Sequence, residues 1–220
     1  MPTPIDWKSI NVVFLDLDGT LLDLYFDNYF WHEIVPLRFS EMCKIELHDA
    51  KQQLQKRYKS KSGTLDWYCV DYWTDELGLD ILALKREFSK RIQIFPNVEK
   101  FLNKLRYHGK HIYLVTNAHR KTVEIKMDYS GIEDYFDKII CSHDYGYPKE
   151  EQPFWHRFMQ AEPFDPAATL FIDDNLAVLA AAEVFGIQHL LSIKQPDSSK
   201  PLQDTQHYRA LTDFEEIMPV

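Results

Sequence analysis

The sequence is poor in glycine and cysteine and has no long apolar run. Seven glycines in 220 residues argue against a disordered, Gly-linked or collagen-like chain. The three cysteines are odd in number and far apart, which disfavours a disulfide framework and a zinc site and fits a reducing compartment. No stretch approaches the roughly 20 apolar residues of a membrane helix, and residues 1–6 lack the pattern of a secretory signal. We therefore expect a cytoplasmic chain that does not enter a membrane.

The chain also has fewer basic than acidic residues. The chain has 25 Lys and Arg against 34 Asp and Glu, for a formal net charge of −9. Because nucleic-acid binders usually turn a basic face to the phosphates, this balance argues against a nucleic-acid partner. It does not exclude a small anionic substrate, since a few lysines or a bound metal can reverse the sign of the charge inside a pocket.

Five short apolar runs have the pattern of buried strands in a parallel sheet. They span residues 11–17, 111–116, 138–141, 169–172 and 187–193. Helical patterns fill the later intervals at residues 98–107, 120–130, 150–161 and 176–185. This alternation predicts an α/β fold with a doubly wound, Rossmann-like, five-stranded parallel sheet. For residues 195–220 we expect a loop and one short helix.

The interval between the first two runs is different, because it contains only helical patterns. They lie at residues 28–38, 46–59, 65–77 and 81–92. A right-handed crossover between parallel strands needs only one helix. We therefore interpret residues 22–93 as an inserted, all-helical cap and residues 1–21 and 94–220 as the core. Such a cap is expected above the carboxyl edge of the sheet, where open α/β sheets bind ligands.

Polar side chains follow four of the predicted strands at the point where each strand ends. The clusters are Asp16-Leu17-Asp18-Gly19-Thr20, Thr116-Asn117, Gly146-Tyr147-Pro148-Lys149-Glu150 and Asp173-Asp174. Each cluster taken alone also fits an ordinary polar turn or helix cap. The carboxyl ends of parallel strands meet at one edge of a sheet, so recurrence at four strand ends favours a single site.

The residue types in this crevice indicate phosphate chemistry. Carboxylates without a set of Cys or His ligands select Mg²⁺ over zinc. Adjacent carboxylates such as Asp173 and Asp174 repel each other unless a cation lies between them. A metal and a lysine would offset the negative charge as a carboxylate approaches a phosphate dianion. Of the two aspartates after the first strand, one would attack phosphorus and the other would exchange protons with the leaving alkoxide and with water.

In order and spacing, the four clusters resemble the motifs of the haloacid dehalogenase-like (HAD) hydrolases. The resemblance implies that Asp16 is the nucleophile and that Asp18 is the general acid and base. It also implies that Thr116 binds the phosphate with Asn117 beside it, and that Lys149 stabilises charge. True dehalogenases of the superfamily do not use an acid/base aspartate at the position of Asp18, so the resemblance is to a phosphate-handling member.

The resemblance further implies a Mg²⁺ cofactor. The ion would be held by Asp16, the backbone carbonyl of Asp18 and the Asp173/Asp174 pair. Within the pair, Asp174 matches the more regular metal position, whereas Asp173 binds directly or through water. Thr20 would fix the turn around the nucleophile.

Within the superfamily, the whole chain resembles the bacterial GMP/IMP nucleotidases. Beyond the shared motifs, the likeness rests on residues 26–31, 65–73, 116–119, 146–150 and 196–198. It implies a small-molecule substrate, a purine nucleoside monophosphate. Because flat rings stack on a purine and an amide can bond its edge, the candidate substrate residues in the cap are Asn28, Trp31, Trp67, Tyr68 and Tyr72. Each ring also fits the core of a small helical bundle.

Two alternatives stay open on the sequence. A sugar-phosphate phosphatase or a phosphomutase would use the same core, and no clear feature of the sequence separates them from a nucleotidase. A non-catalytic binding protein of the same fold would be expected to lack one of Asp16, Asp18, Lys149 or Asp174, and all four are present.

Overall fold

The structure is a computed structural model that describes residues 5–219 of the chain. Within these residues, six strands form one parallel sheet in the order β3-β2-β1-β4-β5-β6. The strands are β1 (Val12–Leu15), β2 (His111–Thr116), β3 (Lys138–Cys141), β4 (Thr169–Ile172), β5 (His189–Ile193) and β6 (Ala210–Leu211). The first strand of the sequence therefore lies in the middle of the sheet.

All five predicted strands are present, and those at 111–116, 138–141 and 169–172 have the predicted bounds. The expectation of a five-stranded sheet is wrong by one strand, because β6 pairs with β5 at the edge. The β6 strand has two residues, which is too short to produce a recognisable apolar pattern. The last stretch, predicted as a loop with a short helix, contains this strand and a 3₁₀ turn at Phe214–Ile217.

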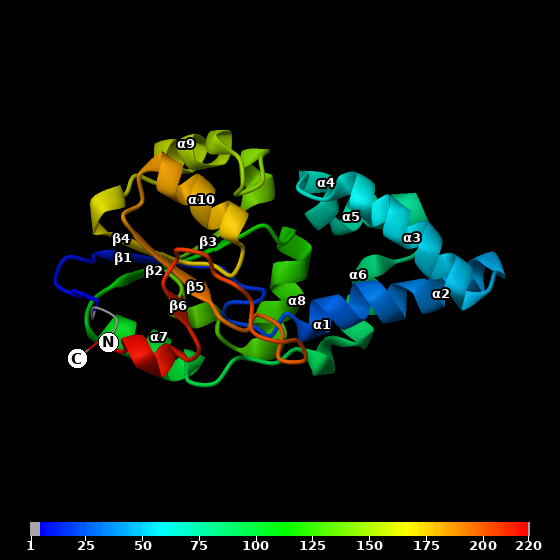
Figure 1. The fold of residues 1–220 in the computed structure, drawn as a ribbon, viewed down its shortest axis with the longest axis horizontal. Helices are drawn as coiled ribbons and strands as arrows, with labels where there is room; N and C mark the ends of the chain where they lie inside the picture. Colours follow the sequence, from blue (N-terminus) through cyan, green and yellow to red (C-terminus); the bar gives the residue numbers. More distant parts are fainter. Residues whose placement is uncertain (1–4, 220) are drawn as a thin grey trace.

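Helices cover both faces of the sheet, as Figure 1 shows. The core helices are α7 (Val98–Tyr107), α8 (Arg120–Ser130), α9 (Gln152–Ala161) and α10 (Leu176–Phe185). On one face, Val13 and Leu15 pack with residues of α7 and α8. On the other face, Phe14 packs with residues of α9 and α10. Because both faces are buried, the strands are continuous apolar runs, which is why the sequence reveals them.

Residues 25–91, which we call the helical segment, form a separate bundle. Its elements are α1 (Tyr25–Tyr29), a π-helical turn (Phe30–Ile34), α2 (Val35–Cys43), α3 (Leu47–Lys61), α4 (Leu65–Tyr68), α5 (Val70–Leu77), α6 (Ile81–Glu87) and a 3₁₀ turn (Ser89–Arg91). The helix predicted at 65–77 is broken at Cys69, whose backbone is extended. The bundle has its own apolar cluster, centred on side chains such as Phe30, Leu54 and Trp73.

The two ends of the helical segment leave the core side by side. Leu22 and Ile94 form an antiparallel bridge, and the Asp23 amide donates to the Gln93 carbonyl over 2.9 Å. In Figure 1 the segment lies beyond the end of the sheet from which β1 leads into α1. In the described residues, no helix is both long and apolar enough to span a membrane. Of the N-terminal residues 1–6 considered above, residues 1–4 lie outside the described part, as does residue 220.

Candidate active site

The turn after β1 brings two aspartates to one cavity. Backbone amides of residues 21 and 22 both donate to the carbonyl of Leu17, which closes a tight loop directly after Asp16. Gly19 in this loop has a φ of +84°, and a Cβ at this position would lie 2.6 Å from Asp174 Oδ2. Glycine is therefore required here both by the backbone conformation and by the close approach of Asp174. As a result, Asp16 and Asp18 line the same cavity.

Most of the predicted site residues line this cavity, which has a volume of about 280 Å³ and lies between the sheet edge and the helical segment. They are Asp16, Asp18, Asn28, Trp31, Trp67, Tyr68, Thr116, Asn117, Lys149, Asp173 and Asp174. Two predicted residues do not line it. Thr20 is fully buried and faces a separate small pocket beside Phe95. Tyr72 packs edge-on against Trp73, beneath the Lys61 ammonium group.

Lys149 lies at the centre of the predicted catalytic group and is 2% exposed. Its Nζ donates to Asp16 Oδ1 over 2.5 Å, to Asp173 Oδ2 over 2.6 Å and to the Val115 carbonyl over 3.0 Å. Burial lowers the pKa of the Lys149 ammonium group, but Asp16 and Asp173 outweigh that effect and raise the pKa above its ordinary value. Lys149 is therefore a fixed positive charge in direct contact with two carboxylates.

Three carboxylates form a group that could hold a metal ion. One oxygen from each of Asp16, Asp173 and Asp174 lies within 4.8 Å of the others. Burial raises the pKa of Asp173 to about 7, with Lys149 opposing and Asp16 reinforcing the shift. Burial, followed by repulsion from Asp173 and Asp16, raises the pKa of Asp174 well above its ordinary value. Because a divalent cation would remove this repulsion and takes oxygen ligands, the three carboxylates fit such an ion.

A hydrogen-bonded group joins the end of β2 to the helical segment. The Thr116 hydroxyl accepts from the Ala118 amide over 3.0 Å, and the Asn117 side chain donates to Glu150 Oε2 over 2.8 Å. The Tyr68 hydroxyl of α4 donates to Glu150 Oε1 over 2.7 Å. The sequence pattern placed Glu150 in the same cluster as Lys149, but no role was predicted for it. Through Glu150, one side chain of the helical segment is fixed to the core at the edge of the cavity.

Three further charged residues line the cavity and were not predicted: Lys126, Asp27 and Lys85. Lys126 Nζ donates to Asp18 Oδ1 over 2.5 Å and to Asp27 Oδ2 over 2.7 Å. Burial raises the pKa of Asp18 to about 6, although Lys126 opposes this shift. The sequence contained a signal for both lysines. Lys126 lies three residues after buried Val123, and Lys85 lies four residues after buried Ile81. At these helical spacings, the buried face normally carries an apolar side chain.

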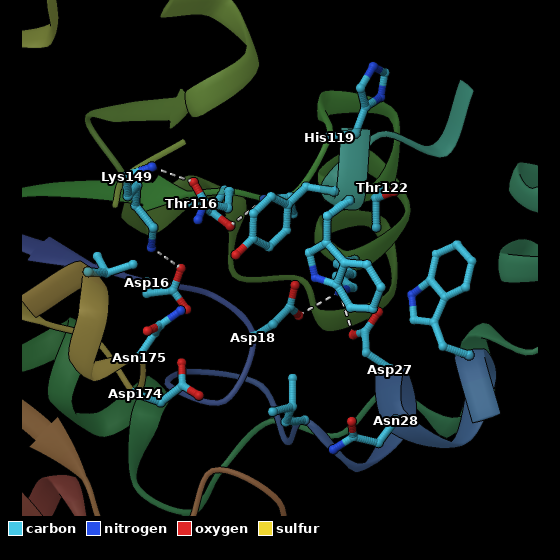
Figure 2. A pocket seen from close by; sticks show the side chains of 18 of the residues that line it. Asp16, Asp18, Asp27, Asn28, Thr116, His119, Thr122, Lys149, Asp174 and Asn175 are labelled. Carbon is cyan, nitrogen blue, oxygen red and sulfur yellow. Dashed lines mark hydrogen bonds and ion pairs between the residues drawn. The ribbon is translucent and has the colours of Figure 1, made fainter. Parts of the chain in front are cut away.

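Two of the predicted aromatic residues, Trp31 and Trp67, belong both to the packing of the bundle and to the wall of the cavity. Trp31 and Trp67 line the cavity, and both rings also pack against Trp73, with centroid distances of 5.9 and 6.2 Å. The Asn28 side-chain amide donates one N–H to Asp197 Oδ2 over 2.6 Å, and its oxygen can act as an acceptor. In the view of Figure 2, Asp18 lies between Asp27 and the Asp16/Asp174 pair.

Comparison with known proteins gives consistent results. A family model described as haloacid dehalogenase-like hydrolase matches residues 10–186. The chain is 38% identical to GMP/IMP nucleotidase YrfG of Escherichia coli K12, over 98% of this chain and 97% of that protein. It is 24% identical to a phosphoglycolate phosphatase of Pseudomonas putida, over 94% of this chain and 78% of that protein. A crystal structure of a HAD phosphatase from Thermococcus onnurineus matches with a TM-score of 0.78 and 20% identity, covering 94% of this chain and 95% of that chain.

Proposed function

The chain belongs to the haloacid dehalogenase-like hydrolase family, and we propose that it is a Mg²⁺-dependent phosphomonoesterase that hydrolyses purine nucleoside monophosphates such as GMP and IMP. The observation that carries this proposal is the composition of one cavity. Its walls contain the three carboxylates and Lys149 together with the indole rings of Trp31 and Trp67. A phosphate site and a flat apolar wall in one cavity suit a nucleotide.

In this proposal Asp16 is the nucleophile. One of its oxygens is held by Lys149, and the other attacks phosphorus as the bond from phosphorus to the ribose oxygen breaks. Asp18 gives its proton to the departing oxygen. A water molecule then attacks the aspartyl phosphate, and Asp18 takes a proton from that water. The bond between phosphorus and Asp16 breaks, which releases inorganic phosphate and restores both carboxyl groups.

The remaining core residues bind and orient the phosphate. The Thr116 hydroxyl and the Lys149 ammonium group supply donors for the phosphoryl oxygens, and Asn117 holds the backbone amide of Lys149 over 2.8 Å. Asp16, Asp173, Asp174 and the backbone carbonyl of Asp18 would hold Mg²⁺. The bound ion supplies positive charge that offsets the repulsion between the phosphate dianion and the attacking carboxylate.

The helical segment would select the leaving group. Trp31 and Trp67 offer rings on which a purine can stack, and the free Asn28 oxygen can accept a bond from its edge. Tyr68 closes the cavity through its bond to Glu150, which limits the access of water to the reacting phosphate. Tyr72, which does not line the cavity, has no part in this proposal.

Phosphate release from a panel of esters tests the proposal. The panel contains GMP, IMP, AMP, pyrimidine monophosphates, sugar phosphates, 2-phosphoglycolate and p-nitrophenyl phosphate, each with Mg²⁺ and with a chelator. We expect Mg²⁺-dependent release that is fastest from GMP or IMP. Release from sugar phosphates alone would contradict the purine assignment and keep the core chemistry. Absence of release from every ester would contradict both.

A phosphatase for small non-nucleotide esters is the second candidate. It is favoured by the 24% identity to a protein named phosphoglycolate phosphatase. The aromatic wall of the cavity argues for the nucleotide, because a two-carbon substrate has no surface to stack on Trp31 or Trp67. The relative rates for 2-phosphoglycolate and GMP separate the two candidates directly.

A further inference from the structure

A second buried group of charges lies next to the proposed acid/base residue. It consists of Lys126 on α8, Asp27 on α1 and Lys85 on α6. The side chains of Lys126 and Lys85 are 2% and 3% exposed, and that of Asp27 is 17% exposed. Lys126 bridges Asp18 Oδ1 and Asp27 Oδ2, and Lys85 Nζ donates to Asp27 Oδ1 over 2.7 Å. The four side chains therefore form one chain of ion pairs from Asp18 into the helical segment.

The arrangement of partners shows what Lys126 adds. Each oxygen of Asp27 has its own lysine, with Lys85 on Oδ1 and Lys126 on Oδ2. Without Lys126, Asp27 would keep a cationic partner, whereas Asp18 would lose the lysine that now contacts it. An unpaired buried charge is costly, and a methionine would fill the same space on a helix face that also carries buried Val123 and Met127. Compared with an apolar residue at position 126, the lysine therefore adds a partner for Asp18 that this carboxylate would otherwise lack.

Lys126 comes from the core of the molecule. The α8 helix begins four residues after β2 ends, and Val123 and Met127 anchor it in the core cluster below the sheet. Thr122, which is 4% exposed, lies one turn before Lys126 and also lines the cavity. The α6 helix, which carries Lys85, packs against α8. Lys126 is thus held in place by the packing of α8 on the core and by its ion pair with Asp27.

We propose that Lys126 is a positioning residue for Asp18, and that Asp27 holds Lys126 in place. This inference rests on the proposed function, because it assumes that Asp18 exchanges protons with the leaving group and with water. Lys126 binds one oxygen of the Asp18 carboxyl group and thereby reserves the other for proton transfer. A carboxyl group anchored at one oxygen has a defined orientation, and small displacements of a catalytic group have large effects on rate.

A double-mutant cycle tests this proposal. The variants are Lys126→Met, Asp18→Asn and the double variant, and the readouts are the single-turnover release of inorganic phosphate from p-nitrophenyl phosphate, which requires Asp18 to take a proton from water, and the steady-state kcat and KM with Mg²⁺. The aryl ester makes the result independent of the nucleobase. We expect Lys126→Met to lower the rate by about 30-fold with little change in KM. In the Asp18→Asn background, the same substitution should cost no more than about threefold, because Lys126 acts through Asp18.

Two further variants complete the design. Lys100→Met removes a lysine from a surface ion pair with Glu215, where the lysine is 54% exposed, and should leave the rate unchanged. Asp27→Asn loosens Lys126 without removing it and should lower the rate by a smaller factor, again only when Asp18 is present. If Lys126→Met does not fold, the cycle is run with Asp27→Asn instead. Thermal unfolding of each variant shows which proteins are folded.

Three other outcomes overturn the inference. If Lys126→Met lowered the rate by the same factor in the wild-type and the Asp18→Asn backgrounds, Lys126 would not act through Asp18. A raised KM with an unchanged kcat would show that Lys126 binds the substrate directly. A wild-type protein that hydrolyses no phosphate ester would overturn the inference together with the proposed function. A wild-type protein that hydrolyses only sugar phosphates and the aryl ester would overturn the purine assignment, while the cycle would still decide the role of Lys126.

Discussion

Tyr68 and Glu150 join the helical segment to the core at the edge of the cavity. The Tyr68 hydroxyl donates to Glu150 Oε1 over 2.7 Å, and Glu150 directly follows Lys149. Burial raises the pKa of Tyr68 above its ordinary value, and the Glu150 carboxylate reinforces the shift, so the phenol stays a donor at neutral pH. The bond therefore couples the position of α4 to the segment that carries Lys149.

Loss of this hydroxyl should weaken closure of the cavity. We expect Tyr68→Phe to lower kcat/KM for GMP by about fivefold, the equivalent of about 1 kcal/mol for one hydrogen bond. The loss for p-nitrophenyl phosphate should be smaller, because that ester has no nucleobase for the helical segment to hold. Steady-state kinetics with both esters measure the difference. Tyr107→Phe, at a residue that is 82% exposed, is the control and should change neither rate. Equal losses for the two esters would contradict a role in closure.

The close approach of Asp174 to Gly19 leads to a second prediction. Gly19→Ala should cost about 1–2 kcal/mol of unfolding free energy for the left-handed backbone alone. The added methyl group should also displace the Asp174 carboxylate and lower activity by about a hundredfold. Gly63→Ala is a matched control, since Gly63 has a φ of +79° with nothing within 4 Å of an added Cβ. Denaturant unfolding and the phosphatase rate are measured on both variants. If Gly19→Ala kept wild-type activity, Asp174 would not need its present position.

The repulsion among Asp16, Asp173 and Asp174 predicts that the effect of Asp174→Asn on stability changes sign when Mg²⁺ is added. In the presence of a chelator, Asp174→Asn should stabilise the protein, because it removes one of three crowded negative charges. With Mg²⁺ at a hundred times its dissociation constant, the wild-type protein should gain about 2.7 kcal/mol, and the variant should gain much less. Thermal unfolding with chelator and with Mg²⁺ gives both comparisons. A variant that gained as much as the wild type would show that Asp174 does not hold the ion.

His143 should make stability depend on pH. Burial lowers the pKa of His143, and the neighbouring His119 lowers it further. Below the ordinary pKa of about 6.5 the unfolded chain binds the proton more tightly than the folded protein, so stability falls as the pH decreases through this range. We therefore expect His143→Gln to lose less unfolding free energy than the wild type between pH 7 and pH 5, as measured by denaturant unfolding at each pH.

A matched substitution controls for histidine content in this experiment. His207 is 65% exposed, and His207→Gln should leave the pH dependence as in the wild type. An unchanged slope in His143→Gln, or a flattened slope in both variants, would contradict the argument from burial.

The sequence predicts a helix or strand well when the pattern of apolar and polar residues within that element is enough to define it. Strands β2 and β4 are buried on both faces and bounded by polar residues, so their bounds could be recognised from the sequence. The helical pattern of residues 65–77 is continuous, and the break at Cys69 depends on local backbone conformation that periodicity does not report. The two-residue strand β6 exists only through its pairing with β5.

The same distinction holds for the site. Asp16 and Lys149 follow parallel strands, so topology alone brings them to one edge. Lys126 and Asp27 meet only because the helical segment packs on α8 in one orientation, and no spacing in the sequence fixes that orientation. Tyr72 was a candidate as an aromatic residue of the cap, but its helix turns it toward Lys61 and away from the cavity.

The most direct test of the account is phosphate release from GMP by the wild type and by Asp16→Asn, both with Mg²⁺ present. Asparagine keeps the shape of the side chain and removes the nucleophilic oxygen charge, so the variant should stay folded and its rate should fall by about a thousandfold or more. Wild-type release with loss in the variant is the predicted result. A variant that retained a tenth of the wild-type rate would contradict the assignment of Asp16 as the nucleophile.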